Sequence, residues 1–89
     1  MIIMYLIVVY DIEQKRVSKV MRVCREYLDH VQNSVFEGEI TSANFKELKS
    51  RLSRTIDLNT DSIIIYELWK ENFKRGVIGV EKKEIDNFL

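Results

Sequence analysis

The chain has 89 residues, with 14 basic and 14 acidic side chains, one cysteine and no proline. This length suffices for one small domain, and the balanced charge means that only the placement of the cations could indicate nucleic-acid binding. The single cysteine and single histidine exclude an internal disulfide and a Cys/His metal site, so that a bound metal would be a hard cation held by oxygen atoms.

The first ten residues, Met1–Tyr10, are almost wholly apolar and end at the carboxylate of Asp11. The run is about half of the ~20 residues that span a bilayer, and it lacks the basic start of a signal peptide. It therefore predicts a buried strand, covered on both faces, in a cytoplasmic protein without a membrane partner. The residues alone leave three roles open for Asp11: a helix cap, an ion pair with Lys15 or Arg16, or a metal ligand.

A helix is predicted over residues 14–28, where apolar side chains recur at helical spacing. The side opposite the apolar residues carries a basic stripe that Glu26 interrupts. Its cations are the candidates for contact with a phosphate backbone: Lys15, Arg16, Lys19, Arg22 and Arg25. An ordinary solvated helix face is the alternative.

The next segments predict a hairpin of strands at 30–33 and 34–40, a helix over 42–55 capped by Thr41 or Ser42, and a strand over 62–68. This order predicts an α+β, ferredoxin-like βαββαβ domain over residues 1–68, with two helices on one face of an antiparallel sheet. Residues 69–89 have no partner strand in that arrangement. We predict that they form an additional C-terminal strand exchanged across a homodimer, packing on the partner protomer. A tail folded on its own chain is the alternative.

Three stretches, YLIVVYDI, VQNSVFEGEIT and DSIIIYEL, resemble the small CRISPR-associated adaptation proteins, the second of the two universal Cas proteins. The likeness runs in order from Met4 to Leu68, and the close IDNFL also fits the family. The resemblance implies a homodimer at the centre of the integrase complex that inserts spacers into a CRISPR array. In that complex it bridges the partner CRISPR integrase and binds double-stranded DNA. Some members of the family are described as metal-dependent nucleases on RNA or double-stranded DNA.

The resemblance also implies a site at the end of the first strand. Asp11 is the candidate metal ligand and catalytic residue, with its copy facing it across the dimer axis. Two such carboxylates could share a Mg²⁺ ion that keeps several waters and activates one of them. Ser34 is a second catalytic candidate, and Tyr10 and Phe36 are placed near the shared cleft. His30 stands where family members often carry arginine, so that a backbone contact there would be weaker.

Two other functions stay open at the level of sequence. One is a stand-alone ribonuclease toxin of the same fold, acting on single-stranded RNA. The other is a non-catalytic RNA-binding module, although the aromatic strand motif of such modules is missing. The residues are compatible with both a nuclease and a non-catalytic scaffold.

Overall fold

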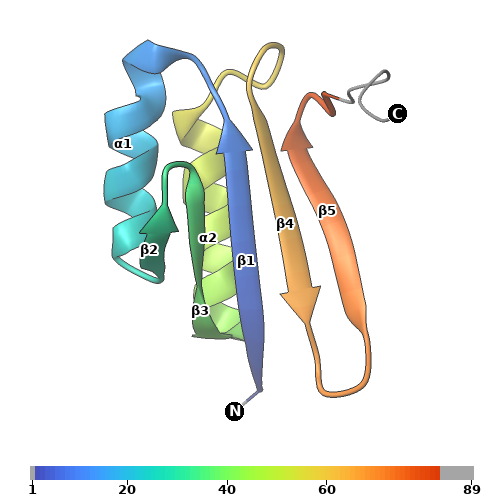
Figure 1. Cartoon of the computed structure of the whole chain (residues 1–89). Coiled ribbons are helices and arrows are strands. Elements are labelled where there is room, and N and C mark those ends of the chain that lie inside the picture. The colour runs from blue at the N-terminus through green and yellow to red at the C-terminus, as the bar shows by residue number, and fades with distance from the viewer. Residues whose placement is uncertain (1, 83–89) are drawn as a thin grey trace.

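The computed structural model describes residues 2–82, which form one antiparallel sheet and two helices (Figure 1). The strands lie in the order β2-β3-β1-β4-β5. The first four of them have the ferredoxin-like arrangement that the sequence predicts. In chain order the elements are β1 (Ile3–Asp11), α1 (Gln14–Arg25), β2 (Asp29–Gln32), β3 (Val35–Thr41), α2 (Ser42–Thr55), β4 (Ser62–Leu68) and β5 (Phe73–Gly79).

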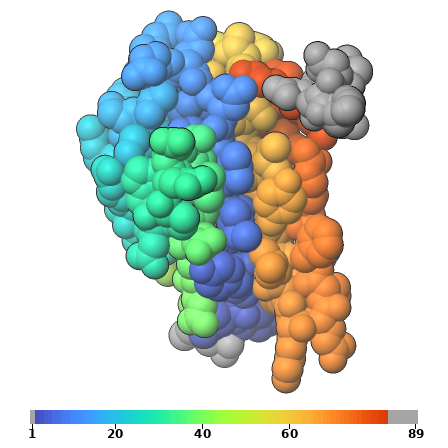
Figure 2. Space-filling view, in the orientation of Figure 1, coloured from blue at the N-terminus to red at the C-terminus, as the bar shows by residue number. Residues whose placement is uncertain are grey.

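Both helices cover the same face of the sheet, and the core lies between the two layers (Figure 1). Alternate residues of β1, from Met4 to Tyr10, are buried on the helix side, as the period of a strand requires. The helices bury Val20, Val23, Cys24, Phe45, Leu48 and Leu52 against them. The opposite face of the sheet is open in the single chain, with β1 between β3 and β4 (Figure 2). The prediction of cover on both faces is therefore met on one face only.

Local signals set the element boundaries closely but not everywhere. Helix α2 has the predicted bounds, and the Thr41 hydroxyl caps it by accepting from the Asn44 N–H at 3.1 Å. Helix α1 ends three residues earlier than predicted, and residues after Arg25 form a turn. The hairpin turns at Asn33, whose φ of 35° is in the left-handed region that asparagine tolerates. Among residues 2–82, neither helix is long and apolar enough to cross a membrane.

The segment after β4 has a partner within its own chain. Strand β5 pairs with β4 along its full length, from Ser62 opposite Gly79 to Leu68 opposite Phe73. The prediction that this segment has no strand to pair with is thus wrong for residues 73–79, where the intrachain alternative holds. The crossing of the C-terminal segment to a second protomer concerns a dimer and stays a prediction, and residues 83–89 lie outside the described part of the chain.

The end of β5 approaches the α2–β4 loop very closely. The Val80 N–H donates to the carbonyl oxygen of Asp61 at 2.8 Å. Gly79 has a φ of 91°, and a Cβ at this position would overlap the Asp61 carbonyl. Glycine at 79 is therefore required both by its backbone conformation and by the contact. At Gly76, in the same strand, a methyl group would meet nothing within 4 Å.

We expect Gly79→Ala to destabilise the fold by about 2 kcal/mol or more, because it combines a strained φ with an overlap. Gly76→Ala is the matched control, and its free energy of unfolding should equal or slightly exceed that of the wild type. Urea unfolding at one fixed protein concentration measures both. Equal stability of the two variants would contradict the close approach of β5 to Asp61.

Candidate active site at the end of the first strand

Asp11 is the last residue of β1 and lies opposite Ser62 of β4. Its side chain is 74% exposed. Tyr10, the preceding residue, is buried on the helix side, so that Asp11 projects from the open face of the sheet.

Two of the three roles considered for Asp11 can now be judged. Glu13, not Asp11, occupies the N-cap position of α1, and its side chain makes no capping hydrogen bond. Lys82 is the cation that approaches Asp11, with Nζ 3.6 Å from Oδ2 and 3.3 Å from the backbone oxygen. The prediction of a pair with Lys15 or Arg16 is therefore wrong. The metal-ligand role stays a prediction.

An open pocket of about 350 Å³ brings together three of the four residues predicted for the catalytic cleft. Its lining includes Tyr10, Asp11, Asn33 and Ser34. The Tyr10 N–H also donates to the Ser34 carbonyl at 3.1 Å, which ties the hairpin turn to the end of β1. The lining also contains Ile12, Val17 and Met21, so that both polar and apolar residues border this space.

Phe36 does not line this pocket. Its side chain is fully buried, 6.2 Å from the Tyr10 ring and stacked at 4.6 Å under the His30 ring. Nε2 of His30 lies 2.7 Å from the Asn33 carbonyl oxygen. Both side chains therefore contribute to the packing and closure of the hairpin. The expected position of Phe36 near the cleft is not found in the single chain, because the core encloses its side chain.

Arg16 differs from the other cations of the predicted stripe, because Asp61 holds its guanidinium. Nε donates to Asp61 Oδ2 at 2.6 Å and Nη2 donates to Oδ1 at 3.1 Å. The Arg16 side chain is only 18% exposed and Asp61 is fully buried. Asp61 also accepts from the N–H groups of Glu13, at 3.0 Å, and Asp57, at 2.9 Å. It thereby fixes the loop that directly follows Asp11.

The role of Asp61 in holding this loop was not predicted, since DLNTD is typical of an ordinary turn. The hydrogen bonds from Arg16, joined by those from the Asp57 and Glu13 backbone, hold the pKa of Asp61 well below its usual value. Burial acts in the opposite direction and is outweighed. An acid placed immediately before a buried strand was the available signal.

The other four cations of the stripe are exposed on α1: Lys15, Lys19, Arg22 and Arg25. Glu26, which interrupts the stripe, is bound by Arg51 of α2 at 2.7 Å. Since α1 covers the face opposite to the one from which Asp11 projects, the structure does not gather these cations around Asp11 (Figure 1).

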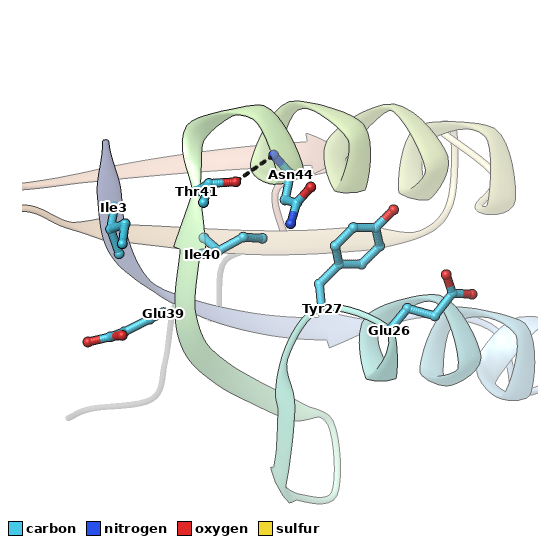
Figure 3. A pocket seen from close by; sticks show the side chains of 7 residues that line it. All are labelled: Ile3, Glu26, Tyr27, Glu39, Ile40, Thr41 and Asn44. Carbon is cyan, nitrogen blue, oxygen red and sulfur yellow. Dashed lines mark hydrogen bonds between the residues drawn. The ribbon is translucent and has the colours of Figure 1, made fainter. Parts of the chain in front are cut away.

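A second pocket, of about 240 Å³, lies at the other end of the sheet (Figure 3). Three of its polar side chains are already engaged: Tyr27 donates to Glu47 at 3.0 Å, Glu26 accepts from Arg51, and Thr41 caps α2. Within residues 2–82, no three His, Cys, Asp or Glu side chains gather closely enough to hold a metal ion. One chain thus offers an exposed single carboxylate at Asp11, and a second carboxylate would have to come from another copy.

The family model described as CRISPR associated protein Cas2 matches residues 4–75. The chain belongs to the Cas2 family. The CRISPR-associated endoribonuclease Cas2 of Methanocaldococcus jannaschii is 47% identical over 88 residues, covering 97% of this chain and 76% of the relative. The protein of the same name from Thermococcus kodakarensis is 46% identical over 86 residues, covering 97% and 100%.

Solved Cas2 structures have the same fold. One crystal structure of cas2 gives a TM-score of 0.74 at 40% identity and covers 99% of this chain and 100% of that one. Streptococcus pyogenes Cas2 at pH 6.5 gives a TM-score of 0.69 at 42% identity and covers 76% and 89%. The ferredoxin-like interpretation and the resemblance drawn from the sequence are both confirmed.

We expect Asp61→Asn to lower the free energy of unfolding at pH 7 by about 3 kcal/mol, because it removes the negative charge that pairs with Arg16 and one of the two accepting oxygens. The folded-state pKa of Asp61 lies below the unfolded value of about 3.9. The contribution of Asp61 to the free energy of unfolding is therefore present above that value and is lost progressively as the pH falls below it. Urea unfolding at pH 7 and pH 3 should show that the variant loses less stability on acidification than the wild type.

Asp29→Asn is the control for this prediction, because Asp29 is an exposed carboxylate of β2. It should unfold like the wild type at pH 7. If Asp61→Asn keeps the wild-type free energy of unfolding at pH 7, the hydrogen bonds of Asp61 do not hold the loop.

Proposed function

We propose that this Cas2-family chain acts in CRISPR adaptation as a homodimeric nucleic-acid-binding scaffold, with metal-dependent phosphodiester hydrolysis at paired Asp11 side chains. The observation that carries the proposal is the position of Asp11. It is exposed at the end of a sheet face that is apolar and uncovered in the single chain. A partner that covers this face would also meet Asp11.

The open face has the composition of an interface. Val9, Ile64 and Val77 lie side by side across three strands and are half-buried. Toward the other end of the same face are the exposed apolar side chains of Ile3, Tyr5, Leu68 and Phe73. A contiguous apolar patch of this kind marks an interaction site, and a small domain gains stability by covering it. A second copy is the occupant we propose, because the same face can be self-complementary about a two-fold axis.

Such an axis would bring two Asp11 carboxylates toward each other. The single carboxylate of one chain does not fit a metal by itself, whereas Mg²⁺ is commonly held by one or two carboxylates and keeps several waters. When bound, the ion would supply an activated water and a clamp for the phosphate. Lys82 must leave Asp11 before that carboxylate can act as a ligand. Ser34 lines the same pocket, and we expect its hydroxyl to donate to a phosphate oxygen or to a water.

The wider role rests on family membership. The relatives described above carry the name endoribonuclease, which supports RNA as a substrate. The place of the family in CRISPR adaptation supports double-stranded DNA as a ligand and a CRISPR integrase as the protein partner. The combination of a dimer-forming sheet face with basic helices supports the scaffold role in particular.

We expect Asp11→Asn to reduce Mg²⁺-dependent cleavage to background, because the amide is a neutral and weaker metal ligand. The fold, the dimer and duplex binding should be unchanged. Cleavage of single-stranded RNA and duplex DNA, followed over pH with several divalent ions, is the measurement, with Asp29→Asn as the control. If Asp11→Asn cleaves as fast as the wild type, the paired-carboxylate site is refuted. If the wild type itself cleaves neither substrate, the function is restricted to the scaffold.

We also expect Ile64→Glu to convert the dimer to a monomer, because it places a charge at the centre of the open face. Sedimentation equilibrium would measure the mass, with circular dichroism to verify the fold. Ser50→Glu, at an exposed position of α2, should remain dimeric. A dimer that persists in Ile64→Glu would place the interface elsewhere.

A further inference from the structure

One row of side chains on the open sheet face has opposite charges at its two ends. Strand pairing places Ile7 of β1 between Glu37 of β3 and Tyr66 of β4. Arg75 of β5 lies opposite Tyr66 and continues the row. The neighbours of Ile7 on β1 are buried on the helix side, so that Ile7 and the residues paired with it face the open side. The row therefore presents a carboxylate on β3 and a guanidinium on β5.

These two charges cannot reach each other within one chain, because three strand spacings, about 14 Å, separate them. Glu37 is half-buried, and no cation of residues 2–82 forms an ion pair with it. The Arg75 side chain is 38% exposed, and its Nη2 lies 3.1 Å from Oε2 of Glu81. A guanidinium has five N–H groups, so that this contact leaves donors for a second carboxylate. Both ends of the row can therefore accept a partner from outside the chain.

Two copies that join their open faces have two choices of two-fold axis in the plane between the sheets, because packed sheets keep their strands roughly aligned. An axis across the strands places every strand over its own copy. The acids of β3 then face each other, and Arg75 faces its own copy. An axis along the strands, between β1 and β4, exchanges the two ends of the row, so that Glu37 of each copy faces Arg75 of the other. Charge therefore favours the axis along the strands.

The apolar row beside these charges fits the same axis. Val35 of β3 and Val9 of β1 are paired, and Ile64 of β4 and Val77 of β5 complete this row. Its midpoint is again the line between β1 and β4, so that an axis along this line stacks the row on its own copy. Asp11, at the end of β1, lies beside the same line and approaches its copy across it. An axis across the strands would instead carry the two Asp11 side chains to opposite ends of the dimer.

We infer that Glu37 of each protomer forms an ion pair with Arg75 of the other, and that these two symmetric pairs select the dimer in which the Asp11 side chains meet. The inference rests on the dimer proposed above and names the contacts that orient it. The two long side chains can span the ~10 Å between packed sheets. Asp29 of β2, opposite Glu37, lies beyond the last strand of the facing sheet in this arrangement and takes no part in it.

The test is an exchange of charge, followed by sedimentation equilibrium of the full chain in about 0.1 M salt. Glu37→Arg and Arg75→Glu each bring like charges together twice in a dimer, and each should weaken dimerisation about tenfold or more. The double variant Glu37→Arg, Arg75→Glu reverses both charges and should dimerise within about threefold of the wild type. An equimolar mixture of the two single variants should form a heterodimer, because both of its contacts then join opposite charges.

The matched control is the double variant Glu71→Arg, Arg75→Glu, in which the first change lies at an exposed position between β4 and β5. It has the same net charge as the restoring double variant but leaves Glu37 opposite a carboxylate. It should therefore dimerise as weakly as Arg75→Glu alone. Circular dichroism would verify that every variant folds.

Each other outcome decides against the inference. If the single variants dimerise as tightly as the wild type, these charges do not orient the dimer, whereas Ile64→Glu still decides whether the open face is the interface. If the double variant of Glu37 and Arg75 folds but does not recover, the two residues do not meet. If it recovers and the mixture does not, the residues that meet belong to one chain, and the pair between protomers is refuted. A monomeric wild type would refute the dimer of the proposed function itself.

Discussion

The buried carboxylate of Asp61 is the contact on which the arrangement of the site depends. It joins the loop after β1 through Glu13, α1 through Arg16, and the end of α2 through the Asp57 N–H, while its own carbonyl accepts from Val80 after β5. A fully buried charge persists only where charged and hydrogen-bonding partners surround it, and the partners of this carboxylate come from three segments of the chain. The loop that begins at Asp11 can therefore adopt few positions relative to α1, and the close passage of Gly79 ties the last strand to the same point.

Around this junction the fold assigns different chemistry to its two layers. The helix layer concentrates cations outside and apolar side chains inside, and the sheet presents an apolar face edged by acids on its other side. A partner that needs apolar contact and a partner that needs positive charge are thus directed to opposite sides of the domain. A second copy on the open face would leave the exposed cations of the helices uncovered. A chain without net charge thus separates its apolar surface from its positive charge.

Much of this could be predicted from the sequence, because the period of the buried residues differs between strands and helices. The βαββαβ order, the cap at Thr41 and the exposed position of Asp11 follow from such local signals. The role of Arg16 could not be predicted, since its partner Asp61 lies 45 residues away and only the folded chain brings them together. The pairing of β5 was also missed. It is an edge strand whose residues are mostly exposed, so that burial leaves little periodic pattern in FKRGVIG. Helix α1 was predicted too long because Tyr27 and Leu28 continue the apolar spacing through the turn that ends it.

The remaining expectations about the metal and the C-terminal segment share one residue, Lys82. Its ammonium group lies beside the Asp11 carboxylate, and it is attached to the chain only two residues after Val80, where β5 is bound to Asp61. While Lys82 stays there, the positive charge opposes the approach of a divalent cation to Asp11. A C-terminal segment that crosses to a second protomer would carry Lys82 away and leave two carboxylates near the same axis. Strand exchange in a dimer would then favour metal binding, because it removes the positive charge of Lys82 from Asp11. By linkage, metal binding would in turn favour the exchanged dimer.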